Sequence, residues 1–101
     1  MEVQIIAVWD LEKLLEQTNA LLIDLREKED YEKGHIKGAM HMVYEDIFYE
    51  AKQFQKNRPL VLYCERGNAS LLAGKILGEM GFVTYTILGG YQAYCMKNSG
   101  K

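Results

Sequence analysis

The chain has 101 residues, of which 49 % are hydrophobic and 26 % are charged, and its formal net charge is −2. This composition excludes an intrinsically disordered chain, and it gives no overall electrostatic attraction for nucleic acid or for an anionic membrane. Two cysteines are too few for a disulfide scaffold, and with two histidines elsewhere in the chain they argue against a structural zinc site.

The length predicts one domain over residues 1–101, with an ordered core over about residues 3–97 and a frayed end over residues 98–101. No apolar run approaches the ~20 residues that span a bilayer. The N-terminal stretch contains acidic residues and no basic segment, which is unlike a signal peptide. We therefore expect a cytoplasmic protein that has free thiols, binds no metal or cofactor, and is a monomer or a weak dimer.

Signals for strands and helices alternate along the chain. Strands are predicted from short apolar runs, and helices from apolar residues that recur at positions i, i+3 and i+4. In chain order the sequence predicts a strand over 3–8, a helix over 10–17, a strand over 20–24, a helix over 27–33, a short strand over 39–42, a helix over 45–56, a strand over 60–63, a helix over 69–80, a strand over 83–88 and a helix over 91–97. Alternation of this kind predicts an α/β domain with a mostly parallel sheet.

Two of the predicted strands, 20–24 and 60–63, are continuous apolar runs, which are typical of strands buried on both faces of a parallel sheet. They lead to Asp24 and Cys64. Ligands of such sheets bind beyond the carboxyl ends of the strands, so both residues are candidates for a functional site.

The helix over 69–80 carries a regular apolar stripe and, beside it, a line of small residues formed by Ser70, Gly74 and Gly78. Each glycine costs about 1 kcal/mol relative to alanine within a helix. We therefore expect a second structural element to pack closely against this line.

The segment from Leu60 to Ser70 gives the strongest chemical signal. A buried strand leads to Cys64, a loop over residues 64–69 follows, and a helix begins. Gly67 and Asn68 tolerate positive φ, so the loop can curl with its N–H groups pointing inward and form an anion cradle with the helix N-terminus. Such a cradle favours the thiolate, which is the attacking form of cysteine.

Two charged residues of this loop act in opposite directions. Arg66 adds positive charge, whereas Glu65 would oppose a thiolate and is expected to point outward. A free cysteine is often inert, but the placement of Cys64 between a buried strand and a glycine-containing turn favours a reactive thiol.

Three blocks of the sequence resemble the rhodanese-like sulfurtransferase family. The loop that Cys64 opens resembles the family's active-site loop. Residues 22–26 and 30–39 match the family pattern I-D-x-R followed by E-Y/F-x-x-G-H-I-x-G-A, and residues 81–91 match its C-terminal pattern, with Tyr91 where tryptophan is common. The resemblance implies an α/β rhodanese fold with a five-stranded, mainly parallel sheet sandwiched between helices.

The resemblance also implies a sulfur relay. The Cys64 thiolate would take the outer sulfur of a small anionic donor such as thiosulfate, and the resulting persulfide would pass it to cyanide, a thiol or thioredoxin. A protein is a further candidate donor. Substrate-binding residues would be those of the loop, namely Glu65, Arg66, Gly67, Asn68, Ala69 and Ser70.

Other candidates have a simpler explanation. Asp24, Arg26 and His35 are interpreted as structural support near the site. Cys95 shares one face of the last helix with Tyr91 and Tyr94 and is most simply a small buried hydrophobic residue. A sharper alternative makes it a resolving cysteine for the Cys64 persulfide.

Three other functions compete with sulfur transfer. A Cys-loop phosphatase or arsenate reductase needs His before the cysteine and Arg six residues after it, where this chain has Tyr63 and Ser70, and its loop is one residue longer. A non-enzymatic docking module would not need Cys64. A persulfide carrier that takes sulfur from a protein and turns over small molecules slowly is the strongest alternative, because of Glu65 and Ala69.

We predict weak affinity for thiosulfate. Many relatives carry a basic residue or threonine at the position of Ala69 and arginine at that of Glu65, so Arg66 alone supplies positive charge in this loop. Steady-state kinetics with thiosulfate test this prediction, and a micromolar Michaelis constant would contradict it.

Overall fold

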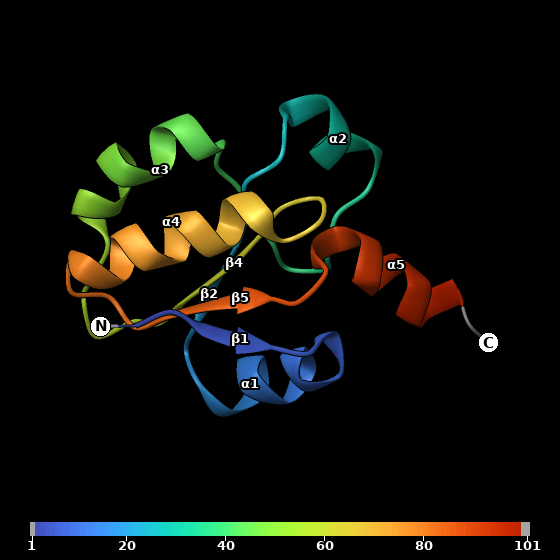
Figure 1. The fold of residues 1–101 in the computed structure, drawn as a ribbon, viewed down its shortest axis with the longest axis horizontal. Helices are drawn as coiled ribbons and strands as arrows, with labels where there is room; N and C mark the ends of the chain where they lie inside the picture. The colour runs from blue at the N-terminus through green and yellow to red at the C-terminus, as the bar shows by residue number, and fades with distance from the viewer. Residues whose placement is uncertain (1, 100–101) are drawn as a thin grey trace.

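The computed structural model describes residues 2–99 and contains one five-stranded sheet (Figure 1). The strands are β1 (Gln4–Ile6), β2 (Leu21–Asp24), β3 (Met40–His41), β4 (Leu60–Tyr63) and β5 (Thr84–Ile87). They are ordered β1-β5-β4-β2-β3, and every neighbouring pair is parallel. The predicted α/β fold is therefore confirmed, with a sheet that is parallel throughout rather than mainly parallel.

Helices cover both faces of the sheet (Figure 1). The helices are α1 (Leu11–Gln17), α2 (Lys28–Lys33), α3 (Tyr44–Glu50), α4 (Asn68–Glu79) and α5 (Gly90–Ser99), and short 3-10 turns span Val8–Asp10 and Ala51–Gln53. Helices α3 and α4 pack on one face, whereas α1 and the start of α5 pack on the other.

Some predicted boundaries are wrong. The helix expected over 45–56 ends at Glu50 and tightens into the 3-10 turn, because Phe54 folds back onto the Phe82 ring at a centroid distance of 6.5 Å. The strand expected over 3–8 ends at Ile6. Helix α5 continues to Ser99, so residues 98 and 99 are helical rather than frayed, while residues 100 and 101 lie outside the described part.

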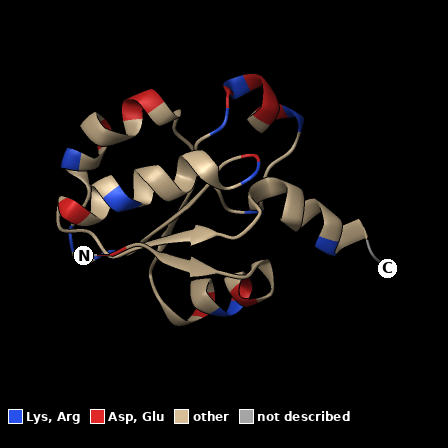
Figure 2. Ribbon diagram, in the orientation of Figure 1, with Lys and Arg blue, Asp and Glu red and all other residues tan. Residues whose placement is uncertain are grey.

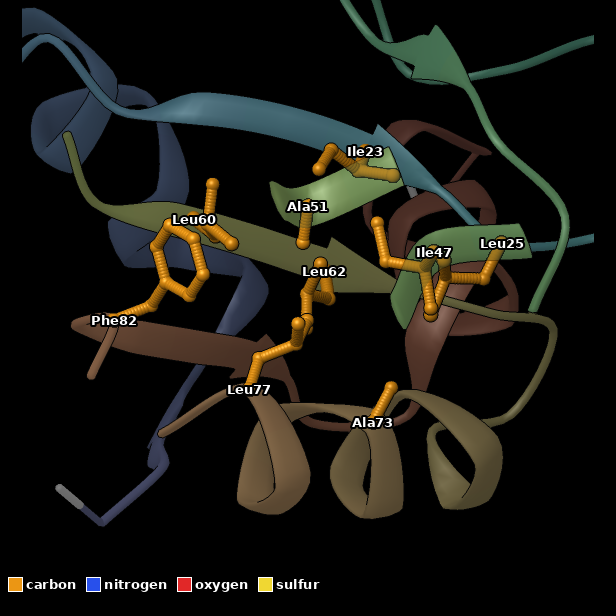
Figure 3. Packing of buried hydrophobic residues seen from close by; sticks show 9 residues of the cluster. All are labelled: Ile23, Leu25, Ile47, Ala51, Leu60, Leu62, Ala73, Leu77 and Phe82. Carbon is orange, nitrogen blue, oxygen red and sulfur yellow. The ribbon is translucent and has the colours of Figure 1, made fainter. Parts of the chain in front are cut away.

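The core consists of two clusters, one on each face of the sheet. Because side chains alternate along a strand, β4 supplies Leu60 and Leu62 to the cluster under α3 and α4, and Val61 and Tyr63 to the opposite one. All four are fully buried. Figure 3 shows the first cluster, whose buried members are Ile23, Leu25, Ile47, Ala51, Leu60, Leu62, Ala73, Leu77 and Phe82.

The small-residue line of α4 is packed as expected. A Cβ atom on Gly74 would lie 2.5 Å from Val3 Cγ2 and 3.7 Å from Thr84 Oγ1. The Thr84 hydroxyl also donates a hydrogen bond to the Gly74 carbonyl over 2.9 Å. Gly74 therefore allows two elements, the segment before β1 and strand β5, to pack closely against α4.

The order of the strands places the ends of β2 and β4 next to each other. Asp24, the last residue of β2, is paired with Tyr63, the last residue of β4. From β2 the chain leads outward to β3, whereas from β4 it leads to β5 on the other side. Such a switch point leaves a crevice beyond the strand ends, and Cys64 opens the loop at this point. Within residues 2–99, no helix is long and apolar enough to cross a membrane.

Two leucines on α4 test how much the packing stabilises the fold. Leu77 is fully buried, whereas Leu72 is 52 % exposed. We expect Leu77→Ala to lower the free energy of unfolding by about 2–5 kcal/mol through lost contacts and a residual cavity. Leu72→Ala, the same change on the same helix, should change it by about 0.5 kcal/mol or less. Urea unfolding of both variants measures the difference, and equal losses would contradict this description of the core.

Candidate active site

Cys64 follows β4 directly and is buried at the head of its loop. Its Sγ accepts hydrogen bonds from the N–H groups of Gly67, over 3.2 Å, and Ser70, over 3.3 Å. Gly67 precedes α4 with a φ of 107°, in the left-handed region that glycine adopts without strain. This turn directs the N–H groups of Gly67 and of Ser70, which lies in the first turn of the helix, toward the sulfur, where their dipoles stabilise negative charge.

The Ser70 side chain lies under the sulfur and is fully buried. The Cys64 thiol donates to Ser70 Oγ over 3.5 Å. Ser70 Oγ also lies 2.6 Å from Thr86 Oγ1 on β5 and donates to the Gly67 carbonyl over 3.2 Å. Because a hydroxyl can rotate and act as donor or acceptor, Ser70 can adapt to either protonation state of the sulfur.

The first turn of α5 holds the outer side of the loop. The Tyr91 N–H donates to the Cys64 carbonyl over 2.8 Å, and the Gln92 N–H donates to the Glu65 carbonyl over 3.0 Å. Gly90 has a φ of 60°, and a Cβ atom there would collide with the Cys64 carbonyl and lie 2.8 Å from that of Glu65. The sequence pattern does not predict this support, although the Gly89-Gly90 pair is a signal for it.

Asp24 and Arg26 form a buried ion pair beside the loop. Arg26 Nη2 lies 2.8 Å from Asp24 Oδ2, and Arg26 Nε and the Arg26 N–H also donate to the same carboxylate. Arg26 Nη2 further donates to the Gly34 carbonyl over 2.6 Å, and its guanidinium lies 3.9 Å from the centre of the Tyr91 ring. The pair thereby joins β2, the end of α2 and the start of α5.

Burial and charge shift the pKa values of three neighbouring groups. Burial alone would lower the pKa of Arg26, but the hydrogen bond and charge of Asp24 outweigh it and raise that pKa. Burial, reinforced by the Asp24 carboxylate, raises the pKa of Tyr63. Burial is the main reason why the pKa of Tyr91 is raised, and the neighbouring Cys95 thiol raises it further. Arg26 therefore stays charged and both phenols keep their protons at neutral pH.

The remaining loop residues form the rim. The Glu65 side chain is 52 % exposed and turns to Arg26, where its Oε1 lies 3.4 Å from Nη1, so it points outward as expected. Arg66, Asn68 and Ala69 are exposed. Of the predicted substrate-binding residues, Gly67 and Ser70 therefore contact the sulfur, whereas the other four are exposed and make no recorded contact with it.

His35 is exposed and contacts Tyr31 rather than the Cys64 loop. Its Nδ1 lies 2.8 Å from the Tyr31 carbonyl, and the two rings stack with centroids 3.8 Å apart. His41 Nε2 lies 2.7 Å from the Arg26 carbonyl oxygen. Among residues 2–99, no group of three or more His, Cys, Asp or Glu is arranged to hold a metal ion.

The expectation for Cys95 is wrong, because this residue is exposed rather than buried. The tyrosines of α5 account for the difference. Tyr91 and Tyr94 stack with centroids 6.0 Å apart and, being larger, occupy the side that packs on the sheet. Cys95, one helical turn after Tyr91, lies beside that ring but at the exposed edge of the helix rather than in the core.

Comparisons with known proteins agree with this geometry. A family model described as Rhodanese-like domain matches residues 8–97. Thiosulfate sulfurtransferase GlpE of Shewanella oneidensis is 30 % identical over 95 residues, covering 93 % of this chain and 94 % of that protein. A tRNA sulfurtransferase of Desulfurococcus amylolyticus is 33 % identical over 76 residues, covering 75 % of this chain but 15 % of that protein. The solved structure of a human single-domain sulfurtransferase matches with a TM-score of 0.82 at 22 % identity, covering 96 % of this chain and 99 % of that one.

The structural match shows the fold, and the two sulfurtransferase relatives support sulfur transfer as the general activity. The family model and the relative matched over nearly its whole length decide the family. This chain belongs to the rhodanese-like domain family.

Proposed function

We propose that this chain is a sulfurtransferase that carries sulfane sulfur as a persulfide on Cys64. The observation that supports this proposal most directly is the pair of N–H groups, from Gly67 and Ser70, that point at Cys64 Sγ. They stabilise an attacking thiolate and, after transfer, a negatively charged persulfide. The same donors therefore serve both halves of the reaction.

In the first half-reaction the Cys64 thiolate attacks the outer sulfur of a donor such as thiosulfate. The Sγ–S bond forms, the S–S bond of thiosulfate breaks, and sulfite leaves with the electron pair. In the second half-reaction cyanide, a thiol or thioredoxin attacks the outer sulfur of the persulfide, and the Cys64 thiolate leaves. When cyanide is the acceptor, the product is thiocyanate. The two half-reactions together then need no outside oxidant, reductant or cofactor.

A persulfide carrier that accepts sulfur from a protein donor is the second candidate. The rim favours it, because Glu65 places a carboxylate next to the opening and Ala69 supplies no charge there. In such a rim, a small dianion has Arg66 as its one cation from the loop, next to the Glu65 carboxylate. Phosphatase chemistry lacks support, because the position that needs an arginine fork holds the buried Ser70, whose hydroxyl contacts Thr86.

Substitution of Cys64 tests the persulfide directly. After incubation with thiosulfate, the intact mass of the wild-type protein should increase by one sulfur atom, and cyanide should release that sulfur as thiocyanate. Cys64→Ser should lose both signals, because an alcohol does not form a persulfide. Cys95→Ser is the matched control and should keep them, since that thiol is exposed and lies outside the cradle. An adduct on the Cys64 variant would contradict the proposal, and a wild-type protein without any adduct would favour the docking module.

A second prediction concerns Gly90, which holds the loop from outside. Gly90→Ala places a Cβ atom against the Cys64 carbonyl and should displace the loop, so we expect loss of most sulfur transfer. Gly38→Ala is the matched control, because Gly38 also has positive φ, 90°, but has nothing within 4 Å of the added atom. Both variants incur about 1–2 kcal/mol of backbone strain.

The readouts are the rate of thiocyanate formation and the free energy of unfolding. Equal loss of activity in the Gly90 and Gly38 variants would show that strain alone, rather than contact with the loop, is responsible.

A further inference from the structure

A groove of about 410 Å³ lies between helix α5 and the 3-10 turn that follows β1. Its lining residues are Val8, Trp9, Ala93, Met96 and Lys97. The turn and the helix pack against each other. The three residues from α5 are spaced three and four positions apart, so they form one face of the helix. We call this surface the Trp9 groove.

Two large apolar side chains of the Trp9 groove are open to solvent. Trp9 is 69 % exposed and Met96 is 71 % exposed, although tryptophan is one of the more buried residue types on average. Val8 is buried beneath them and Ala93 is partly buried. A cluster of exposed apolar side chains on a folded domain is typical of a surface that contacts another molecule.

Helix α5 has apolar residues on the side that faces solvent as well as on the side that packs on the sheet. Tyr91 and Tyr94 pack against the core, whereas Met96 lies on the exposed side. Lys97 is the only charged residue of this helix (Figure 2). A helix with apolar residues around its whole circumference is usually covered by other parts of a protein. The exposed side of α5 therefore lacks a cover.

One charge of each sign borders the apolar centre of the groove. Asp10 directly follows Trp9 on the 3-10 turn and is exposed. Lys97 lies on the opposite wall, with its Nζ 5.4 Å from the centre of the Trp9 ring. Within residues 2–99 neither Asp10 nor Lys97 takes part in an ion pair. The two walls therefore offer a free acid and a free base.

We propose that the Trp9 groove binds the same groove of a second copy of this chain, which gives a weak symmetric dimer. In a twofold dimer both copies use one surface, and every contact between two different residues occurs twice. An acid and a base on opposite walls meet this requirement, because Asp10 of each copy faces Lys97 of the other. Met96, which is unbranched and flexible, enters the facing groove. This inference does not rest on the proposed sulfur transfer.

The size of the surface predicts that the dimer is weak. Standard protein complexes bury about 800 Å² on each partner. Trp9 and Met96 with their neighbours supply roughly a few hundred Å² on each copy, since a large aromatic side chain buries about 150–250 Å². We therefore expect a dissociation constant of about 10–500 μM.

The chain contains a single tryptophan, so its fluorescence reports on this surface alone. Sedimentation equilibrium of the full chain from about 1 μM to 1 mM measures the mass, and Trp9 emission is followed over the same range. The mass should rise from monomer toward dimer, and the emission should shift to shorter wavelength with the same midpoint. A chain that stays monomeric overturns the proposal and leaves the groove to a different partner. A dimer that leaves Trp9 emission unchanged also overturns it, because that dimer uses another surface.

Substitution of Met96 tests the apolar part of the contact. Met96→Ser removes the side chain that enters the facing groove and should raise the dissociation constant roughly ten-fold or more. Leu72→Ser is the matched control, because Leu72 is 52 % exposed but does not line the groove. The control should leave the dissociation constant within about two-fold of the wild-type value, as expected for a surface change outside the contact. Equal effects of the two substitutions would contradict the proposal.

A charge exchange tests the symmetric pairing. Lys97→Glu should raise the dissociation constant roughly five-fold or more, because each copy then presents an acid to Asp10 of the other. Lys52→Glu is the matched control and should have little effect, since Lys52 also lies over an aromatic ring, that of Tyr49 at 5.3 Å, but outside the groove.

The double variant Asp10→Lys with Lys97→Glu exchanges the two charges. It should return the dissociation constant to within about two-fold of the wild-type value, because each ion pair is restored with reversed sign. Urea unfolding establishes that each compared variant is folded. A folded double variant that dimerises as poorly as Lys97→Glu alone would show that Asp10 and Lys97 do not pair, and the symmetric dimer would be wrong.

Discussion

The Cys64 loop depends on hydrogen bonds that it accepts on its outer side. The first N–H groups of a helix have no partner within the helix, so those at the start of α5 can bind carbonyl groups of the loop. Here the N–H groups of Tyr91 and Gln92 bind the carbonyls of Cys64 and Glu65. With those carbonyls fixed outward, the N–H groups of Gly67 and Ser70 face the sulfur.

The same turn of α5 is held in place by Arg26. The guanidinium lies over the Tyr91 ring, binds Asp24 at the end of β2, and reaches the Gly34 carbonyl at the end of α2. Gly34 is also close to Tyr91, because a Cβ atom on Gly34 would lie 2.8 Å from the Tyr91 hydroxyl oxygen. Buried charges and close backbone contacts therefore connect the end of β2 to the turn of α5 that holds the loop in position.

The parts of this arrangement that depend on local sequence could be predicted. The apolar runs before Asp24 and Cys64 indicated two central strands, and Gly67 indicated the turn into α4. Contacts between backbone groups far apart in the chain could not be predicted, since they leave no side-chain pattern. The support from Tyr91 to Cys64 is of this kind, and only the glycine pair before Tyr91 hinted at it.

Burial on α5 was harder to predict for a different reason. Apolar residues, among them Tyr91, Tyr94 and the exposed Met96, occur around the whole helix, so the pattern does not identify its packed side. Cys95 shares a face with Tyr91 and Tyr94, which predicts burial with them, although it is exposed. Phe54 shows the complementary case, in which contact with Phe82 ends a helix that the local pattern would continue.

The sulfur and the rim are stabilised by different kinds of group, and this separation has a consequence for the sulfur transfer that we propose. The groups that contact Cys64 Sγ are neutral, namely the N–H groups of Gly67 and Ser70 and the Ser70 hydroxyl, and none of them is a charged side chain of the rim. Glu65 can consequently follow the nucleophile directly, because its carbonyl is held by Gln92 and its carboxylate faces Arg26. Side chains at the rim can then change to suit a donor while the cradle stays the same.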